Sequence, residues 1–359
     1  MKTVKEKEIK LKIPEKHRKP EKSEVFYNPK MKMNRSLSVA SAKIYFGKKN
    51  ISILDPFSAT GVRAIRYAKE LKGEILASDV SQNAVDLTEK NAELNDVEIE
   101  TERVKANVIL NRAYFDLVDI DPFGSPAPFL QAASKSVKSK GMLGITATDA
   151  TALCGVYPKV CLRNYGAVPL RTEYCHEIAM RILIGFAVKE AAVYEKAVEP
   201  LLVLNDRHYF RLQLKLRKGA KRANKQLDKL GFIYHCFNCG ARKLEAGRFA
   251  EEKKCECGEK FEIGGPVWTG KLFDKKFCRK VLSVIEDEEL EKQIKLMLEE
   301  VGQAPLFYDV HEVFRGSSIP KLERIVEKLK ENGFKASRTH FSPVGIRTNA
   351  GIKDIKKIK

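Results

Sequence analysis

The first half of the chain alternates short apolar runs with segments of helical periodicity. The strands predicted from this pattern span 51–55, 74–78, 97–104, 115–120 and 141–148. The helices predicted between them span 62–71, 81–94 and 126–139. This order predicts a Rossmann-like α/β fold with a doubly wound, mostly parallel sheet, in which ligands bind at the carboxyl ends of the strands.

The pattern changes after residue 150. A long apolar helix is predicted over 171–192, and strands over 197–204 and 209–216 would complete a seven-stranded sheet whose last strand is antiparallel. We therefore predict a first domain over 1–220 and a smaller C-terminal α/β domain over 221–359. The elements predicted in this second domain are helices at 287–301 and 319–332, a strand at 307–314, and strands near 336 and 344.

The turn after the first strand indicates a nucleoside ligand. Asp55 ends that strand, and the following turn contains one glycine, Gly61, in place of the G-x-G-x-x-G of dinucleotide sites. Asp79, followed by Val80, ends the second strand, where a carboxylate can accept both hydroxyls of a ribose. S-adenosylmethionine fits this pattern, since Asp55 can attract its ammonium group. The alternative is a purely structural turn with Asp79 as a helix-capping acid.

The end of the fourth strand carries the sequence Asp121-Pro122-Phe123-Gly124. This pattern is typical of methyltransferases that act on exocyclic amino groups, whose nitrogen lone pair is delocalised into the ring. The Asp121 carboxylate and the Pro122 carbonyl can accept the two N–H bonds and localise that lone pair, while Phe123 stacks on a flipped base. The alternative is an ordinary Asp-Pro turn after a strand.

Composition changes the picture by adding a polyanionic partner. The chain has 359 residues and a formal net charge of +19. The excess lies in three segments, 1–22, 207–225 and 321–359, with net charges of +5, +8 and +7. Such concentrated charge favours nucleic-acid binding over a set of solvated lysine-rich faces. No apolar run is long enough for a membrane span, and we expect a cytoplasmic protein without an obligate protein partner.

Two pairs of cysteines in the second half predict a metal site. Cys236 and Cys239 form a C-x-x-C pair, and Cys255 and Cys257 form a C-x-C pair, each followed by a glycine that permits a positive φ. Four thiolates suit a structural zinc knuckle. Disulfides, spectator thiols, or substitution of a ligand by His235 or Cys278 are the alternatives. The remaining cysteines, Cys154, Cys161 and Cys175, are expected to be free core thiols, with His176 structural.

These motifs together make the sequence resemble the tRNA guanine-26 N2-dimethyltransferase family over nearly its whole length. The segments that carry the resemblance are Phe26-Tyr27-Asn28-Pro29-Lys30-Met31 with Asn34-Arg35, Asp55-Pro56-Phe57-Ser58-Ala59-Thr60-Gly61-Val62-Arg63, Asp119-Ile120-Asp121-Pro122-Phe123-Gly124-Ser125-Pro126, Arg171-Thr172-Glu173-Tyr174-Cys175 and Arg338-Thr339-His340-Phe341-Ser342-Pro343. The first and last of these segments are not general methyltransferase motifs, so the resemblance is specific.

The resemblance implies roles for individual residues. Asp121 would be the catalytic carboxylate, and Phe26 and Phe123 would sandwich the target guanine. The residues implied in cofactor binding are Arg35, Asp55, Arg63, Asp79, Val80, Lys105 and Ala106. The family commonly has an acidic residue where Lys105 stands, which leaves the partner of the adenine amino group open between Asn107 and a backbone carbonyl. It also commonly has Asn-Arg-Asp where this chain has Asn34-Arg35-Ser36.

The resemblance implies transfer of methyl groups from S-adenosylmethionine to N2 of guanine 26 in tRNA. Two alternatives stay open, since Asp-Pro-Phe-Gly reports an exocyclic amine and not the base that carries it. One is an adenine-N6 or rRNA guanine-N2 methyltransferase, and the other is a non-catalytic RNA-binding protein with a degenerate cofactor fold. His340 is assigned either to RNA phosphate or to packing.

Overall fold

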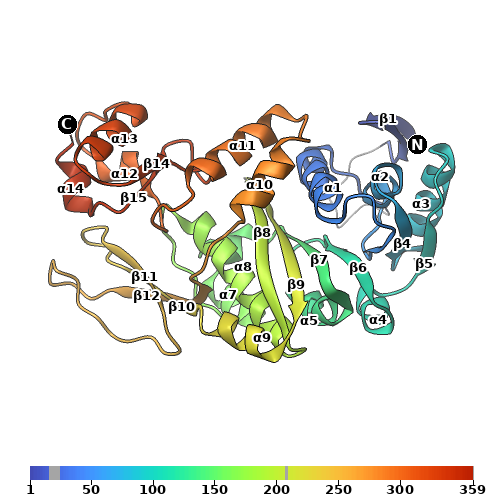
Figure 1. Ribbon diagram of the computed structural model, residues 1–359, viewed down its shortest axis with the longest axis horizontal. Helices are drawn as coiled ribbons and strands as arrows, with labels where there is room; N and C mark the ends of the chain where they lie inside the picture. The colour runs from blue at the N-terminus through green and yellow to red at the C-terminus, as the bar shows by residue number, and fades with distance from the viewer. Residues whose placement is uncertain (16–24, 207–208, 359) are drawn as a thin grey trace.

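The molecule is built around a twisted central sheet. A computed structural model describes residues 1–15, 25–206 and 209–358, and within them the largest sheet has seven strands in the order β5-β4-β3-β6-β7-β9-β8 (Figure 1). Its strands are β3 (Ile51–Asp55), β4 (Gly73–Asp79), β5 (Glu100–Arg103), β6 (Phe115–Ile120), β7 (Val137–Ala147), β8 (Lys196–Asp206) and β9 (Tyr209–Lys218). β9 runs antiparallel to β7 and β8, and the pairs from β5 to β7 are parallel. The predicted fold class is confirmed.

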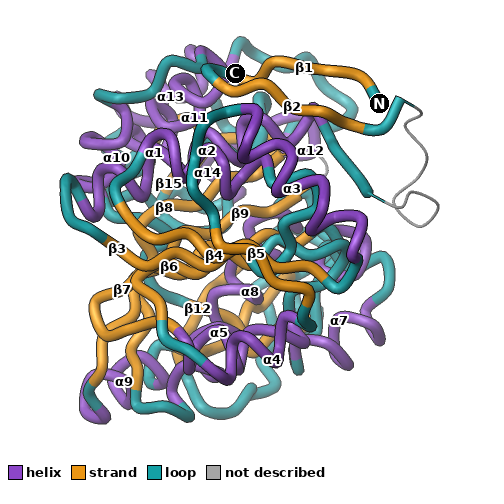
Figure 2. Tube along the Cα trace, turned by 90° about the vertical axis from the view of Figure 1, so that its right-hand side faces the viewer, coloured by secondary structure: helices purple, strands orange, loops and turns teal. Residues whose placement is uncertain are grey.

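Helices cover both faces of this sheet, as Figure 2 shows. One face carries α1 (Lys32–Phe46), α2 (Val62–Glu70) and α3 (Gln82–Leu94), and the other carries α4 (Ala106–Arg112), α5 (Ala127–Ser136) and α8 (Cys175–Ala192). Neighbouring residues of β6 serve the two layers: Leu117 belongs to the apolar core beside α1, and Val118 to the core beside α5 and α8. Burial on both faces explains why the strands read as continuous apolar runs.

Several predicted element ends differ from the observed ones. β5 covers only Glu100–Arg103 of the predicted strand 97–104, and β7 begins at Val137, inside the predicted helix 126–139. The long helix begins at Cys175, after a short turn in which the Cys175 N–H donates to the Thr172 carbonyl at 3.2 Å. Two short helices, α6 (Ala150–Leu153) and α7 (Pro158–Tyr165), fill the connection between β7 and α8.

An N-terminal hairpin of β1 (Lys2–Glu6) and β2 (Ile9–Ile13) lies beside α3. In β2 the apolar residues Ile9, Leu11 and Ile13 are buried, and the alternating Lys10 and Lys12 are exposed. The side-chain amides of Asn91, in α3, and of Asn95, directly after it, each make two hydrogen bonds to the backbone of β2, at 2.6–3.0 Å. Only the charge of segment 1–22 drew attention in the sequence, and residues 16–22 of it lie outside the described part.

The C-terminal part contains two smaller sheets, β11-β10-β12 and β13-β15-β14, within the described residues. Its strands are β10 (Leu230–His235), β11 (Arg242–Ala246), β12 (Glu262–Trp268), β13 (Tyr308–Asp309), β14 (Ala336–Arg338) and β15 (Gly345–Thr348). Its helices are α9 (Ala220–Leu227), α10 (Lys275–Leu282), α11 (Glu288–Glu299), α12 (Val310–Val313), α13 (Leu322–Glu331) and α14 (Ile352–Lys356).

The prediction of a single strand over 307–314 is wrong. It is divided into the two-residue strand β13 and the one-turn helix α12, because the Asp309 side chain accepts a hydrogen bond from the His311 N–H at 2.8 Å and caps the helix. His311 therefore lies on a helix and not in an alternating strand.

Packing continues across the predicted boundary at residue 220. Val267 and Trp268 of β12 share an apolar core with α8, and Phe277 and Val281 of α10 share one with α1. A separate core lies within residues 308–358. The division into 1–220 and 221–359 stays a prediction, and the apolar cores around the central sheet include residues from both sides of this boundary.

A buried ionic network joins α8 to residues 300–347 of the C-terminal part. Glu177 pairs with Arg181 at 2.7 Å and with Arg347 at 2.9 Å, and Arg347 also pairs with Glu300. Burial alone would raise the pKa of Glu177, but Arg347 and Arg181 outweigh it and lower that pKa to about 2. His340 is buried and its Nδ1 lies 2.7 Å from Glu300, so the structure assigns this histidine to packing.

Candidate active site

Three aspartates that end or follow parallel strands lie along one edge of the sheet. Asp55 ends β3, Asp79 ends the neighbouring β4, and Asp121 directly follows β6 on the other side of β3. Asp55 is buried, and it accepts a long hydrogen bond of 3.4 Å from the Phe57 N–H. Burial raises the pKa of Asp55 to about 7, so a positively charged group would stabilise its carboxylate.

The turn after β3 is shaped by its glycine and by Asp79. Gly61 has a φ of +75°, and a Cβ there would lie 2.8 Å from the Thr88 side chain of α3, so no larger residue fits. The Asp79 carboxylate accepts hydrogen bonds from the backbone N–H groups of Ala59 at 3.1 Å and Ser81 at 3.0 Å. These two bonds fix the orientation of Asp79 at the strand end.

Asp121 is held by Arg63. The Arg63 Nη2 donates to Asp121 Oδ2, and the same guanidinium also bonds Asn34 Oδ1 at 3.1 Å and Ser38 Oγ at 2.8 Å. The Asp121 side chain is 20% exposed, whereas that of Arg63 is only 5% exposed. The structure therefore places Arg63 beneath the carboxylate, whereas the family resemblance implied a contact of Arg63 with the cofactor.

Asp119 forms a second, fully buried ionic centre that the sequence reasoning did not assign. Its carboxylate accepts hydrogen bonds from Arg211 at 2.6 and 2.8 Å, from the Tyr67 hydroxyl at 2.6 Å and from Arg63 at 3.3 Å. Burial would raise the pKa of Asp119, but Arg211 and Arg63 hold it well below the usual value. The sequence signal that could have indicated this buried pair is a charged residue within an otherwise apolar strand, which occurs at both Asp119 and Arg211.

The pairing with Asp119 also corrects the interpretation of one basic segment. Arg211 was counted in the segment 207–225 as part of a polyanion-binding patch, but its side chain is fully buried. It therefore cannot contact phosphate. Residues 207 and 208 of that segment lie outside the described part.

The two predicted base-stacking rings lie against each other. Phe26 and Phe123 have ring centroids 5.4 Å apart with an interplanar angle of 72°, an edge-to-face contact. Phe123 is 63% exposed, and the backbone that carries it is fixed where the Gly124 N–H donates to Thr148 Oγ1 at 2.7 Å. A base can enter between the rings only if they separate.

Arg35 is engaged with the N-terminal hairpin. Its Nε donates to Glu6 Oε1 at 2.8 Å, its Nη1 donates to the Asn28 carbonyl at 3.2 Å, and its guanidinium lies 5.3 Å from the centre of the Tyr27 ring. Tyr27 also donates to Glu6 at 3.0 Å. The hairpin thus anchors the segment that carries Phe26, a role of Arg35 that the sequence did not indicate.

The remaining predicted cofactor contacts lie along the same edge. Val80 directly follows Asp79 and is largely exposed, while Lys105 precedes α4 and Ala106 begins it, just after β5. The Lys105 side chain is exposed and Ala106 is buried. Asn107, the suggested partner of the adenine amino group, donates from Nδ2 to the Pro128 carbonyl at 3.2 Å.

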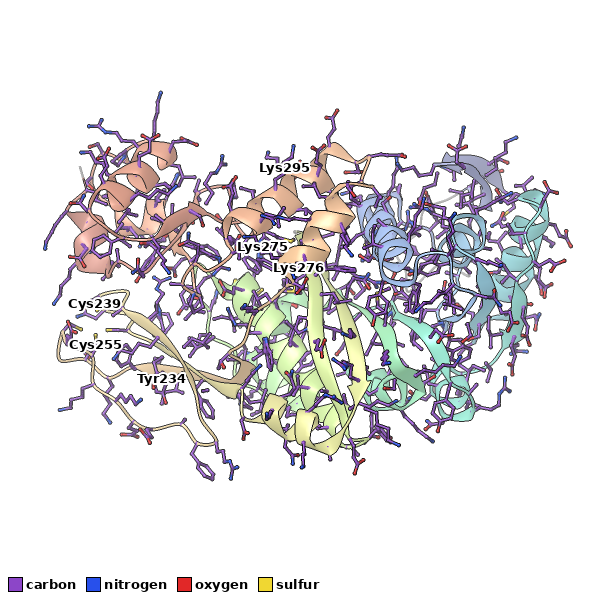
Figure 3. The ribbon with its side chains drawn as sticks, viewed as in Figure 1. Tyr234, Cys239, Cys255, Lys275, Lys276 and Lys295 are labelled. Atoms are coloured by element: carbon purple, nitrogen blue, oxygen red, sulfur yellow. The ribbon has the colours of Figure 1, made fainter. Side chains whose placement is uncertain are left out.

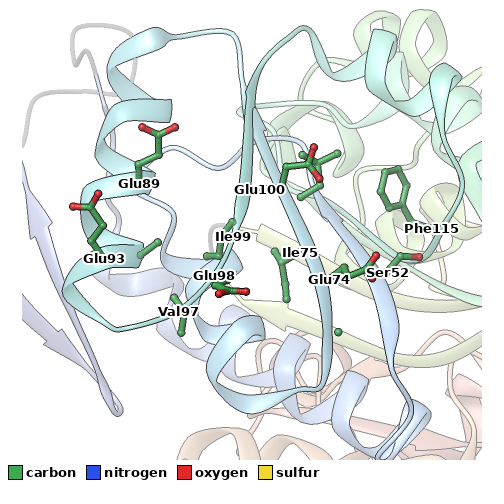
Figure 4. A pocket seen from close by; sticks show the side chains of 13 residues that line it. Ser52, Glu74, Ile75, Glu89, Glu93, Val97, Glu98, Ile99, Glu100 and Phe115 are labelled. Atoms are coloured by element: carbon green, nitrogen blue, oxygen red, sulfur yellow. The ribbon is translucent and has the colours of Figure 1, made fainter.

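A large hollow at the opposite edge of the sheet is not part of this site. It has a volume of about 630 Å³ and lies at the amino ends of β4 and β5, as Figure 4 shows. Its lining includes the acidic residues Glu74, Glu89, Glu93, Glu98 and Glu100. Ligands of such sheets bind at the carboxyl ends, where the three aspartates lie.

The four predicted metal ligands meet at the tip of the β11-β10-β12 sheet, where Figure 3 labels Cys239 and Cys255. Their sulfur atoms all lie within 4.8 Å of one another, with Cys236–Cys257 and Cys239–Cys255 distances of 3.5 Å. All four are free thiols, and Gly240 and Gly258 have the expected positive φ. This donor set fits a tetrahedral zinc ion.

No helix in the described part of the chain is long and apolar enough to cross a membrane.

Comparison with known proteins identifies the family. The family profile described as "N2,N2-dimethylguanosine tRNA methyltransferase" matches residues 4–359. The chain belongs to this family. A curated tRNA (guanine(26)-N(2))-dimethyltransferase from Methanothermobacter thermautotrophicus is 40% identical, covering 99% of this chain and 98% of its own. A relative of the same name from Pyrococcus horikoshii is 39% identical and covers 94% of this chain.

A solved structure of a family member superposes over the whole chain. It is the complex of Trm1 from Pyrococcus horikoshii with S-adenosyl-L-methionine, 37% identical, with a TM-score of 0.89 and coverage of 100% of this chain and 99% of that one. The family resemblance and the predicted enzyme class, a tRNA guanine-26 N2-dimethyltransferase, are confirmed over the two alternatives.

Proposed function

We propose that this family member methylates N2 of guanine 26 in tRNA with S-adenosyl-L-methionine as methyl donor, and that Asp121 is its catalytic residue. The observation that carries the proposal is the position of Asp121, which lies at the carboxyl edge of the sheet next to the strands that end in Asp55 and Asp79. The donor would supply an electrophilic methyl group bound to a positively charged sulfur.

The residues at this edge fit such a donor. The buried Asp55 carboxylate is poorly compensated and would attract a positive group, while the fixed Asp79 carboxylate can accept hydroxyl hydrogen bonds from a ribose. Val80, Lys105 and Ala106 would line the adenine side, because they follow β4 and β5 at the same edge. The resemblance also assigned Arg35 and Arg63 to the cofactor, but we assign them to positioning roles.

Asp121 and the Pro122 carbonyl would orient the amine. Asp121 Oδ2 is used by Arg63, so we assign Oδ1 as the acceptor of one N2–H and the Pro122 carbonyl as the acceptor of the other. Holding both N–H bonds directs the nitrogen lone pair out of the ring plane toward the methyl carbon. As the C–N bond forms, the bond from the methyl carbon to the donor's sulfur would break and leave a neutral thioether, and the nitrogen loses a proton, which Asp121 can accept. After one transfer, one N–H remains for a second.

The contact between Phe26 and Phe123 would be replaced by the base. An edge-to-face pair contributes about 0.5–1.5 kcal/mol beyond area burial, which is small beside the few kcal/mol needed to flip a base. The guanine then regains stacking on one or both rings. Phe26 is anchored through the hairpin, whereas Phe123 is the more exposed ring and the one that can turn aside.

The C-terminal residues 221–359 would form the tRNA-binding domain, with a structural zinc ion on Cys236, Cys239, Cys255 and Cys257. A hollow of about 570 Å³ lies between α10 and residues 300–305, and its lining includes Lys271, Lys275 and Lys276. Figure 3 shows Lys275 and Lys276 on α10 and Lys295 on α11. We assign these exposed lysines to phosphate contacts, which position the tRNA without reading its sequence. A cytoplasmic location remains a prediction.

The test is methyl transfer by Asp121→Asn to unmodified tRNA, with nucleoside analysis of the product. The variant should retain binding of S-adenosyl-L-methionine and tRNA but lose about 10²–10⁴-fold in kcat. Asp116→Asn is a control on the same strand, away from the carboxyl edge, and should remain active. Near-normal turnover by Asp121→Asn, or methylation of tRNA that carries adenine at position 26, would contradict the proposal.

A further inference from the structure

A second group of metal-ligating side chains also lies at the carboxyl ends of the sheet's strands, away from the three aspartates. Cys154 follows the one-turn helix α6, while Cys175 and His176 are the first two residues of α8. One ligand atom from each residue lies within 4.8 Å of the others. Cys154 is buried and the other two are half-buried, so the group is reachable from solvent. From the sequence, these residues were expected to be free core thiols and a structural histidine.

The donor set suits a borderline divalent cation. Thiolate and imidazole are the preferred ligands of Zn²⁺, and three protein ligands leave the fourth tetrahedral position for water or another small ligand. Two thiolates and one neutral imidazole balance the 2+ charge, which is the charge state that a half-buried site tolerates. This composition differs from the four-thiolate knuckle, which has no open position.

Asn205 provides an outer partner for the histidine. Its Nδ2 lies 3.3 Å from His176 Nδ1, and its Oδ1 is buried without a hydrogen-bond partner among the described residues. Turning this amide by 180° brings Oδ1 to a protonated Nδ1, which satisfies the orphan oxygen and leaves Nε2 as the free lone pair. Metal-bound histidines almost always donate their other ring N–H in this way. Phe210, with its centroid 5.7 Å from the His176 ring, packs edge-to-face against it.

We propose that Cys154, Cys175 and His176 form a second metal site, which binds Zn²⁺ with an open fourth position and with Asn205 orienting the imidazole. The metal would join α6 to the start of α8. Asp149, at the other end of α6, accepts hydrogen bonds from the Tyr165 hydroxyl at 2.8 and 2.9 Å, and Ser125 donates to Tyr165 at 2.7 Å. This chain of contacts leads to the loop that carries Phe123. By fixing α6, the metal would therefore help to hold that loop in place.

The experiment counts zinc ions and does not depend on activity. The full-length chain is reduced, stripped with a chelator, freed of the chelator and titrated with Zn²⁺ alone; bound zinc is measured after desalting. We expect the Cys154→Ser and His176→Asn variants each to bind one Zn²⁺ per chain fewer than the wild type. Cys161→Ser removes a neighbouring buried thiol outside the cluster and should leave the count unchanged.

A second measurement covers the case in which a serine variant folds poorly. With Co²⁺ in place of Zn²⁺, His176→Asn should lower the intensity of the visible d–d bands while leaving the signal of the four-cysteine knuckle. A wild-type chain that binds no more zinc than Cys154→Ser and His176→Asn overturns the proposal, whether its Cys154 and Cys175 are free or joined as a disulfide. Loss of methyl transfer with the zinc count intact would instead concern the proposed function.

Discussion

The buried pair of Asp119 and Arg211 provides the most direct test of how the catalytic edge is held. Both side chains are fully buried, and two hydrogen bonds of 2.6 and 2.8 Å join them. The substitution Arg211→Met keeps the length and apolar stem of the side chain but removes the charge. Asp119 then remains in the core with Arg63 at 3.3 Å and the Tyr67 hydroxyl as its partners.

The expected cost follows from burial. Removing one partner of a buried ion pair leaves the other charge poorly compensated and costs about 3–5 kcal/mol. At roughly 2–4 °C per kcal/mol for a domain of this size, the midpoint of thermal unfolding should fall by roughly 6–20 °C. Unfolding would be followed by circular dichroism at neutral pH, where the Asp119 carboxylate is ionised in the wild type.

An exposed ion pair gives the matched control. Lys260 and Glu252 lie 3.4 Å apart with side chains 74% and 86% exposed, and Glu252→Gln should cost less than about 1 kcal/mol. If Arg211→Met lowers the midpoint no further than Glu252→Gln does, Arg211 does not stabilise the sheet through Asp119. The reasoning about the buried centre would then be refuted.

Three further results are expected. Without ligands, the stability of the wild type relative to Asp55→Asn should fall as pH rises from about 4 to about 7, because the folded-state pKa of Asp55 is raised to about 7 and the folded wild type binds the extra proton over that range. The buried His235, whose pKa is lowered to about 4, contributes in the opposite direction but equally in both proteins, so parallel stability profiles of the two would count against the assignment. A zinc chelator should lower the melting temperature of the wild type more than that of Cys255→Ser, which keeps only the site proposed at Cys154, Cys175 and His176, and an equal effect on both would argue against a knuckle zinc. The double variant Lys275→Ala/Lys276→Ala should reduce the slope of log Kd for tRNA against log salt concentration by roughly 1–2, measured by filter binding. Lys260→Ala serves as the control. An unchanged slope in the double variant would show that α10 does not contact the phosphates of tRNA.

The sequence predicted the features that depend on local pattern. The strand–helix alternation gave the parallel sheet, and the residues that end or follow its strands gave Asp55, Asp79 and Asp121. It could not predict partners that lie far apart in the chain. Arg63 and Asp121 are 58 positions apart and Arg211 and Asp119 are 92 apart, so their pairing depends on the tertiary fold.

Short elements were also difficult to predict, for a related reason. The run from Tyr308 to Val313 alternates as a strand would, but the Asp309 cap decides for a helix within one turn. Likewise, the lysines of β2 were interpreted only as charge, while the apolar residues that alternate with them, Ile9, Leu11 and Ile13, form the buried face of a hairpin. In both cases a contact of one side chain, or of one face, outweighs the pattern.

The position of the N-terminal hairpin has a consequence for the order of folding during synthesis. A two-stranded hairpin is marginally stable alone, and the backbone of β2 obtains its side-chain partners Asn91 and Asn95 only when α3 and the residue after it have been made. At 5–20 residues per second, the ribosome needs on the order of 4–16 s to cover that interval. The hairpin anchors the segment of Phe26 through Glu6 and Tyr27, so the first residues to be translated take their place at the site only after α3 has been made.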